Sequence, residues 1–274
     1  MTLAFRNLLT SAAQRGRRSA QCFVDVYSGS GGIGKSLQRA GDFGCAQVDA
    51  RNNSALDATR PEAQKVLLGN IAMHRIRGLW IAFPCTTWCQ AAHGTYRSIE
   101  HLWGKPDLPF HLQQRLQLGS ATFLTTLKLV RAATKHGIPI ILENPAGSLA
   151  WKTEQMQALM GLECCTDIVV DQCQLGRPWQ KATRLVAWNV CDPPRGLQAR
   201  CQPTRLKWIK VCSHTLRPHV VLRGRIDGCL ATQLAEAYPP RLNQLGAQWL
   251  QQSADSIERH CLHVLGYRPA SVNL

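Results

Sequence analysis

Two side chains that could form and break covalent bonds follow apolar runs of the chain. Cys85 comes shortly after the run Leu79–Phe83, and Glu143 ends the run Pro139–Glu143. A thiol can act as a nucleophile, and a carboxyl group that enters the same site can act as an acid. Each residue also has a structural alternative, since free cysteines are commonly buried in cores and strand-end acids commonly cap helices.

A glycine-rich turn is the third feature with chemical potential. The turn Ser28–Gly34 (SGSGGIG) follows the apolar run Cys22–Tyr27. Glycines at a strand-to-helix turn let a ligand approach the backbone and present free N–H groups at a helix N-terminus. The turn satisfies G-x-G-x-x-G, and Asp49 lies at the distance expected for a ribose-binding acid. The pattern predicts a nucleotide cofactor site, either for a nicotinamide or for S-adenosylmethionine. The alternative is a glycine turn without a ligand.

These features must be positioned by strands that alternate with helices. A helix is expected through Leu37 and Ala40, and another through Phe123, Leu127 and Val130. The expected strands are Cys22–Tyr27, Cys45–Asp49, Leu79–Phe83, Pro139–Glu143, Ile168–Val170 and Leu185–Trp188. Such alternation predicts an α/β fold with a doubly wound, mostly parallel sheet. Ligands of such sheets bind beyond the carboxyl ends of the strands, where all three features fall.

Composition and charge narrow the class of protein. The chain has 274 residues, of which 45% are hydrophobic, so it can bury a core and is not disordered throughout. Its formal net charge of +15 favours a polyanionic partner, most commonly nucleic acid, over a merely solvated basic surface. The 12 cysteines are scattered, which favours reduced thiols in an intracellular protein. No apolar run approaches the roughly 18 residues of a membrane span. We therefore expect a soluble, intracellular protein with no membrane partner, nuclear if eukaryotic.

The sequence suggests four regions. Residues 1–20 carry four arginines, and they predict a flexible basic arm, a transit-like segment or a remnant of cloning. Residues 191–230 are rich in proline and basic residues with little periodicity. The expected division is 1–20 basic N-terminal segment, 21–190 catalytic core, 191–230 small basic subdomain for target recognition, and 231–274 C-terminal return to the core.

Taken together, the motifs resemble those of the cytosine-C5 methyltransferases, in particular small divergent phage-borne or mobile-element-borne members. That family carries D-x-F-x-G-x-G-G, then P-C, then E-N-V. Here Asp25–Gly32 resembles the first motif, Pro84-Cys85 the second and Glu143-Asn144-Pro145 the third. Two weaker similarities follow: Gly176–Thr183 resembles G-x-P-Q-x-R-x-R, and Ala237–Pro240 resembles a late A-V-P segment.

The resemblance implies a Rossmann-like methyltransferase fold, S-adenosylmethionine as cofactor and cytosine in DNA as substrate. It implies that Cys85 adds to C6 of the base, that Glu143 is the acid at N3, and that Lys181 is a cation beside the base. Asp49 would hold the ribose hydroxyls and Asp57 the adenine amino group. The cofactor-binding residues that the resemblance implies are Asp25, Tyr27, Ser28, Gly29, Gly31, Gly32, Ile33, Asp49, Asp57 and Pro84.

Several positions depart from the family pattern. Trp179, Lys181 and Thr183 stand where Gln, Arg and Arg are expected, and Cys89 stands where a serine is usual. Three other functions therefore stay open. They are methylation of structured RNA by the same residues, a catalytically silent nucleic-acid-binding module, and a nicotinamide dehydrogenase.

The basic region also contains residues of the types that bind zinc. Cys191, Cys201, Cys212, His214 and His219 could supply four ligands. Their spacings contain no C-x-x-C pair, so the sequence favours reduced thiols and surface histidines, and we expect no metal.

Overall fold

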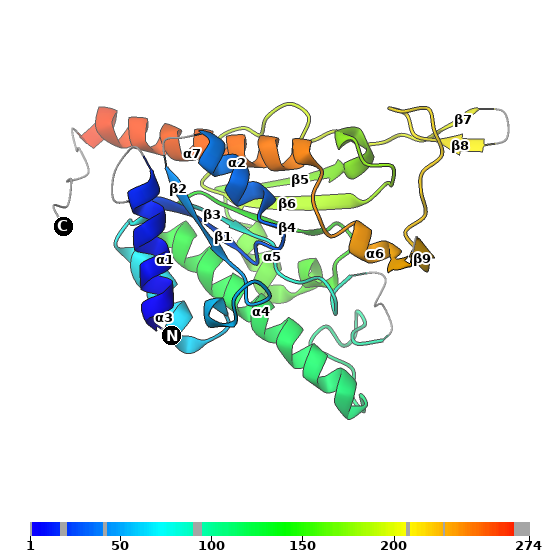
Figure 1. Cartoon of the computed structure of the whole chain (residues 1–274), viewed down its shortest axis with the longest axis horizontal. Coiled ribbons are helices and arrows are strands. Elements are labelled where there is room, and N and C mark those ends of the chain that lie inside the picture. The colour runs from blue at the N-terminus through cyan, green and yellow to red at the C-terminus, as the bar shows by residue number, and fades with distance from the viewer. Residues whose placement is uncertain are drawn as a thin grey trace.

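A computed structural model describes residues 2–16, 21–40, 43–89, 95–206, 209–226 and 228–265. Strands and helices alternate along most of the chain (Figure 1). The strands of the main sheet are β1 (Cys22–Val26), β2 (Gly44–Val48), β3 (Ile76–Ile81), β4 (Ile140–Pro145), β5 (Cys165–Asp171) and β6 (Ala182–Trp188). The α-helices are α1 (Thr2–Arg15), α2 (Gly32–Ala40), α3 (Pro61–Ala72), α4 (Phe110–Lys135), α5 (Glu154–Met160), α6 (Ala231–Leu234) and α7 (Pro240–Leu265). Each of the six expected strands overlaps an observed one.

The main sheet is mostly parallel, with strand order β2-β1-β3-β4-β6-β5. Strands β1 to β4 pair in parallel, whereas β6 runs antiparallel to both β4 and β5. Only residues 172–181 connect β5 to β6, and a parallel crossover needs about a dozen residues or more. Because β6 is reversed, the residues that precede it lie at the edge where β4 ends, and Thr183 pairs with Pro145 there.

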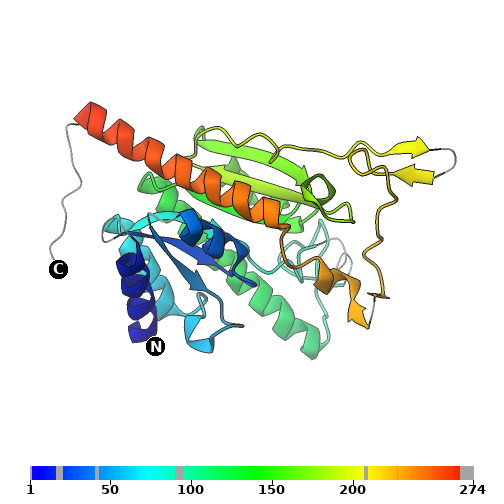
Figure 2. The ribbon, with the colours of Figure 1, turned by 45° about the horizontal axis from the view of Figure 1, so that its top comes forward.

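Helices cover both faces of the sheet, which confirms the doubly wound α/β class (Figure 2). Leu79 and Ile81 of β3 join the core under α1, α3 and α4, whereas Trp80 joins the core under α2 and α7. This alternation follows from the two-residue period of a strand, and it explains why strands buried on both faces are apolar throughout. The arrangement is a mixed α/β fold built on one six-stranded, mostly parallel sheet.

The N-terminal segment differs from the flexible basic arm that its arginines suggested. Residues 2–15 form α1, and its side chains Phe5, Leu9 and Ala12 are buried against the core. These residues lie on one helix face. Their helical spacing lets the segment pack as an amphipathic helix in spite of its arginines. Gly44 of β2 makes the contact possible, since a Cβ there would lie 1.7 Å from the carbonyl oxygen of Ala12. Arg17 and Arg18 lie outside the described residues.

The basic region contains two small antiparallel hairpins. Strand β7 (Thr204–Leu206) pairs with β8 (Ile209–Val211), and β9 (Arg225–Ile226) pairs with β10 (Cys229–Leu230). The side chains of β7 are exposed, and Val211 is the buried residue of β8. In both ribbon views the β7–β8 hairpin extends beyond the main sheet on the side away from α1 (Figures 1 and 2). After this region, α7 returns across α2 and β3.

Among the described residues, none of the helices combines the length and the apolar character that crossing a bilayer requires.

Candidate active site

The glycine turn joins β1 to α2 and carries unusual backbone conformations. Tyr27, Gly29 and Gly31 all have positive φ angles, of 58°, 53° and 69°. A Cβ at Gly31 would also lie 2.5 Å from Oε1 of Gln47. Glycine at position 31 is therefore required by backbone strain and by packing, besides any ligand that approaches the turn.

Asp25 supports the turn from inside the sheet. Its side chain is buried, and its Oδ2 atom accepts a 3.1 Å hydrogen bond from the N–H of Gly34. Burial raises the pKa of Asp25 to about 7; the Gly34 bond lowers it and the negative charge of Asp49 raises it further. The first acid of the motif is thus hydrogen-bonded to the N-terminal turn of α2, although burial disfavours its charged form.

The two downstream acids both lie near enough to Tyr27 to affect its pKa. Asp49 accepts a 2.8 Å hydrogen bond from the N–H of Gly29, which closes the glycine turn against the end of β2. Asp57 accepts hydrogen bonds from the N–H and hydroxyl of Thr59, at 2.9 Å and 2.6 Å. Burial raises the pKa of Tyr27, and the charges of Asp57 and Asp49 add to that rise. The structure therefore brings both predicted cofactor acids to the carboxyl edge of β1 and β2.

The loop that bears Cys85 is a tight turn anchored to β4. The carbonyl of Cys85 accepts hydrogen bonds from the N–H groups of Trp88 and Cys89, at 2.8 Å and 2.9 Å. The buried Asn144 side chain donates a 2.8 Å hydrogen bond to the carbonyl of Phe83. Asn144 directly follows the candidate acid Glu143. Its hydrogen bond therefore ties the segment of the acid to the backbone just before Pro84-Cys85.

Arg97, which the sequence did not single out, holds the same loop from the other side. Its guanidinium is fully buried, donates to the carbonyl of Thr87 at 3.1 Å and lies 3.4 Å from the ring centroid of Trp88. The same group also donates to the carbonyl of Leu102 at 2.8 Å. Burial lowers the pKa of Arg97 to about 10. A lone arginine in a loop gives no sequence signal for burial, which is why it was missed.

The candidate acid Glu143 meets two groups from distant parts of the chain. The hydroxyl of Tyr238 donates a 2.6 Å hydrogen bond to Oε2 of Glu143. Burial raises the pKa of Glu143, while the ammonium of Lys181 and the hydrogen bond from Tyr238 lower it. Lys181 itself donates a 2.8 Å hydrogen bond to the carbonyl of Ala235. A buried carboxyl group with a raised pKa is suited to hold and deliver a proton.

The thiol of Cys85 shares this electrostatic environment. A hydrogen bond with Cys89 and burial raise the pKa of Cys85 well above its usual range; the positive charge of Lys181 lowers it and the negative charge of Glu143 raises it. Lys181 therefore lowers the pKa values of both Cys85 and Glu143, and Glu143 raises that of Cys85. At rest the thiol is protonated, so its activation requires loss of that proton when a substrate arrives.

The two weak motifs contact each other directly. The guanidinium of Arg177 donates to the carbonyls of Ala237 and Tyr238, at 2.9 Å and 2.8 Å. These bonds place the Tyr238 hydroxyl against β4. Trp179 and Thr183, which differ from the family pattern, are buried. Both side chains form a hydrogen bond with the side chain of Gln172.

A cluster of sulfur atoms lies apart from this site. Cys173, Cys201, Cys212 and His219 have ligand-type atoms that all lie within 4.8 Å of one another. Cys191, which the zinc hypothesis included, instead has its sulfur 3.4 Å from the hydroxyl of Ser253. The imidazole of His214 is likewise not part of the cluster.

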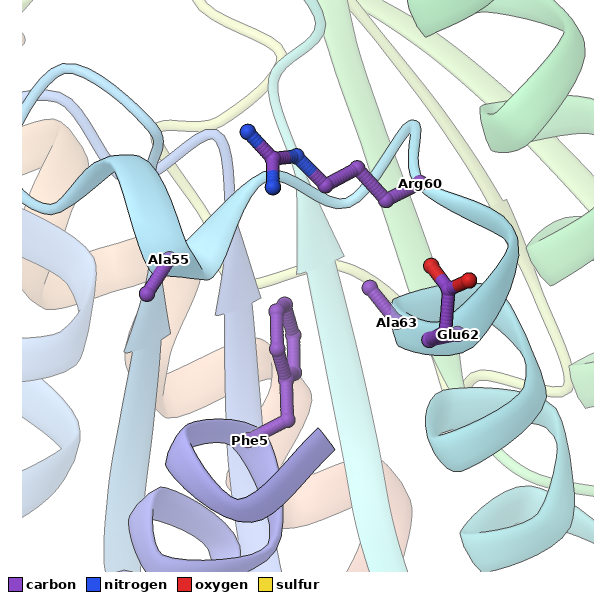
Figure 3. A pocket seen from close by; sticks show the side chains of 5 residues that line it. All are labelled: Phe5, Ala55, Arg60, Glu62 and Ala63. Atoms are coloured by element: carbon purple, nitrogen blue, oxygen red, sulfur yellow. The ribbon is translucent and has the colours of Figure 1, made fainter. Parts of the chain in front are cut away.

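Two surface hollows lie away from the candidate active site. One is lined by Phe5, Ala55, Arg60, Glu62 and Ala63 and has no room for a water molecule (Figure 3). The other, of about 320 Å³, is lined by Arg15, Gln38, Phe43 and Gly44 near the amino end of β2. Neither is lined by Cys85, Glu143 or the glycine turn.

Comparisons with known proteins give no sequence match: no family model and no curated protein matches the chain. Among solved structures, it is similar to a putative DNA modification methyltransferase encoded within a prophage of E. coli, with 13% identity and a TM-score of 0.36 over 61% of this chain and 46% of that one. It is also similar to the Entamoeba histolytica methyltransferase EhMeth, with 9% identity and a TM-score of 0.39 over 89% of this chain and 99% of that one. Both are described as methyltransferases. The chain spans about half the length of the prophage protein, at 46%. At these scores neither likeness assigns an activity or a site residue to this chain.

Proposed function

We propose that this protein transfers a methyl group from S-adenosylmethionine to carbon 5 of cytosine in DNA, with Cys85 as the nucleophile. The observation that carries the proposal is the placement of Cys85 just after β3 and of Glu143 on the neighbouring strand β4, with the ammonium of Lys181 close enough to lower the pKa of both. A nicotinamide dehydrogenase would have no use for a thiol and an acid at these two strand ends.

The glycine turn fits the cofactor. Positive φ angles at Gly29 and Gly31 keep the backbone open to a ligand. The Ser28 hydroxyl oxygen is buried and has no hydrogen-bond partner within the part of the chain that the structure describes. Asp49 keeps unused acceptor capacity for ribose hydroxyls, because a carboxylate has about four lone-pair sites and it accepts two backbone bonds. When bound, S-adenosylmethionine would supply an electrophilic methyl group on its sulfonium.

The residues of this chain would act on the base in a defined order. Cys85 loses its proton to solvent, a step that the neighbouring Lys181 favours, and its sulfur bonds to C6 of cytosine. As this bond forms, the C5=C6 π bond breaks and its electron pair is shared between C5 and N3. Glu143 delivers its proton to N3, which leaves a neutral enamine whose C5 is the nucleophile. After C5 is methylated, N3 returns its proton to Glu143. Loss of the C5 proton to water then restores the double bond and breaks the Cys85–C6 bond. Asn144 and Arg97 are positioning residues that fix the loop of Cys85.

An exposed basic surface supports a nucleic-acid substrate. Arg205 of β7 and Lys210 of β8 are direct cross-strand partners, and both are exposed. Like charges opposite each other disfavour a hairpin, and an anionic partner would relieve this repulsion. Other exposed basic residues of the region are Arg195, Arg200, Arg217, Arg223 and Arg225. A cytosine in duplex DNA would have to be flipped out to reach Cys85.

The decisive test is incubation with methyl-labelled S-adenosylmethionine and separate DNA and RNA pools. We expect labelled 5-methylcytosine in the DNA pool only. Label confined to RNA would favour the RNA methyltransferase, and no label in either pool would favour the silent binding module. Calorimetry addresses the cofactor separately: S-adenosylmethionine should bind far more tightly than NAD, and the reverse order would contradict the cofactor assignment.

A further inference from the structure

We propose that Cys173, Cys201, Cys212 and His219 bind one structural zinc ion. Their three sulfur atoms and one imidazole nitrogen all lie within 4.8 Å of one another. The three cysteines are buried and form their own cluster, separate from the two main cores. Three thiolates and one imidazole are a ligand set typical of structural zinc sites.

The distances between ligand atoms fit a tetrahedral ion. The sulfurs of Cys201 and Cys212 are 3.7 Å apart, and the sulfur of Cys201 is 3.7 Å from Nε2 of His219. With Zn–S bonds of about 2.3 Å and tetrahedral angles, two sulfur ligands lie about 3.8 Å apart. A disulfide needs sulfurs about 2.05 Å apart, so these thiols are not joined to each other.

The surroundings of the cluster favour thiolates. The N–H of His214 points at the sulfur of Cys212 at 3.4 Å, and the side-chain amide of Gln174 donates to the same sulfur at 3.9 Å. The hydroxyl of Ser213 donates to the sulfur of Cys201 at 3.6 Å. Donors aimed at sulfur stabilise its negative charge and orient it, as outer-shell groups do in metal sites.

The local folding of the chain brings the ligands together. Asp171 at the end of β5 is fully buried and accepts a 2.7 Å hydrogen bond from the N–H of Cys201. A turn closed by the Cys212 N–H on the carbonyl of Arg217, at 2.8 Å, leads back toward His219. Cys173 lies in the short 3-10 helix η4 (Gln172–Leu175) that follows β5.

A zinc ion at this position would link the basic region to the end of β5. Three ligands belong to the basic region, whose short strands bury little apolar surface, and Cys173 belongs to η4, directly after β5 of the main sheet. Segments with a small core are commonly stabilised by a metal. Just after His219, the N–H of Val220 donates to the carbonyl of Pro178 at 2.8 Å. A zinc ion would therefore fix the basic region beside the loop that presents Lys181.

The test measures metal in the full chain, purified without added zinc, by mass spectrometry of the elements. We expect one zinc per chain. Cys212→Ser and His219→Ala should lose it, whereas His219→Cys should keep it, because a fourth thiolate is also a zinc ligand. The matched controls Cys191→Ser and Cys164→Ser should keep the full amount. A folded, reduced wild type with no zinc would overturn the proposal, as would loss of zinc in Cys191→Ser with retention in Cys212→Ser.

A second measurement covers the case in which the ligand variants do not fold. Growth with cobalt in place of zinc should give the wild-type protein the absorption bands of tetrahedral cobalt bound by thiolates. A cobalt spectrum without thiolate bands, or a Cys201–Cys212 disulfide found by peptide mapping of the folded chain, would contradict the assignment. Neither measurement depends on methyl transfer, so the zinc site and the proposed function can fail independently.

Discussion

The hydroxyl of Tyr238 donates a 2.6 Å hydrogen bond to Oε2 of Glu143, across 95 residues of sequence. It is a direct link between the late segment before α7 and the candidate acid on β4. Because this bond lowers the pKa of Glu143 against the effect of burial, Tyr238 sets the pH range in which the acid can deliver a proton.

Tyr238→Phe should therefore shift the pH profile of methyl transfer. Glu143 must be protonated to serve N3, so activity falls as pH rises through its folded pKa. Removal of the hydroxyl raises that pKa, and the falling limb moves to higher pH. Because more Glu143 is then protonated at neutral pH, we expect the rate there to rise, by at most about tenfold for the loss of one hydrogen bond to an ionisable group. In a Glu143→Gln background the same change should have no further effect; an additive change would show that Tyr238 acts elsewhere.

Cys85→Ser should abolish the covalent adduct with DNA that contains 5-fluorocytosine. Fluorine at C5 cannot leave as a proton does, so the adduct cannot eliminate, and serine is far less nucleophilic than cysteine at neutral pH. Denaturing electrophoresis with labelled DNA measures the adduct. The matched variant Cys89→Ser should still form it. An adduct that persists in Cys85→Ser and disappears in Cys89→Ser would assign the nucleophile to Cys89.

Asp25→Asn should remove a pH dependence of stability. The pKa of buried Asp25 is raised to about 7, so its contribution to stability is fully present below about pH 4, the unfolded value. It is lost as pH rises through about 7, because the folded state then holds a buried charge. Urea unfolding at pH 8 should show the variant about 4 kcal/mol more stable than wild type, with no gain at pH 4. The exposed control Asp192→Asn should follow the wild-type curve; a parallel shift of Asp25→Asn at both pH values would contradict this cause.

Arg97→Met should destabilise the protein and slow adduct formation. The buried guanidinium satisfies the carbonyls of Thr87 and Leu102 and lies on Trp88. Leaving such acceptors unpaired should cost about 3 kcal/mol of the free energy of unfolding. Arg97→Lys should recover only part of the stability, because an ammonium lacks the planar fork. Thermal unfolding and the rate of trapping by 5-fluorocytosine measure the two effects. Unchanged trapping by folded Arg97→Met would remove its positioning role.

Arg205→Ala and Lys210→Ala should each weaken DNA binding and flatten its salt dependence. Removal of one cation that neutralises a phosphate should reduce the slope of log affinity against log salt by about 0.9. Fluorescence anisotropy with labelled duplexes at several salt concentrations gives the slope. Arg39→Ala, an exposed arginine at the far end of α2, is the control and should leave the slope unchanged. Equal effects of Arg39→Ala and Arg205→Ala would show that the hairpin is not the DNA-binding face.

The sequence by itself determined the features that depend on contiguous residues. Continuous apolar runs indicated the strands, and the helical stretches between them indicated the mostly parallel sheet. In a parallel sheet the carboxyl ends of the strands lie along one edge. The sequence therefore predicted that Cys85 and Glu143 lie near the glycine turn. The tight turn at Cys85 and the positive φ at Gly31 depend on a few consecutive residues, so a short motif can encode them.

The tertiary structure alone decided which distant residues complete each site. The reversal of β6 brings Lys181 to the edge where β4 ends, and no periodicity in the sequence indicates strand direction. Tyr238 reaches Glu143 from the segment before α7, and Arg177 of the β5–β6 connection donates hydrogen bonds to that segment. Cys173 replaces Cys191 in the sulfur cluster because the end of β5, far away in sequence, lies beside the basic region. Contacts across such separations depend on how whole elements pack, and the spacing of residues along the chain does not record that packing.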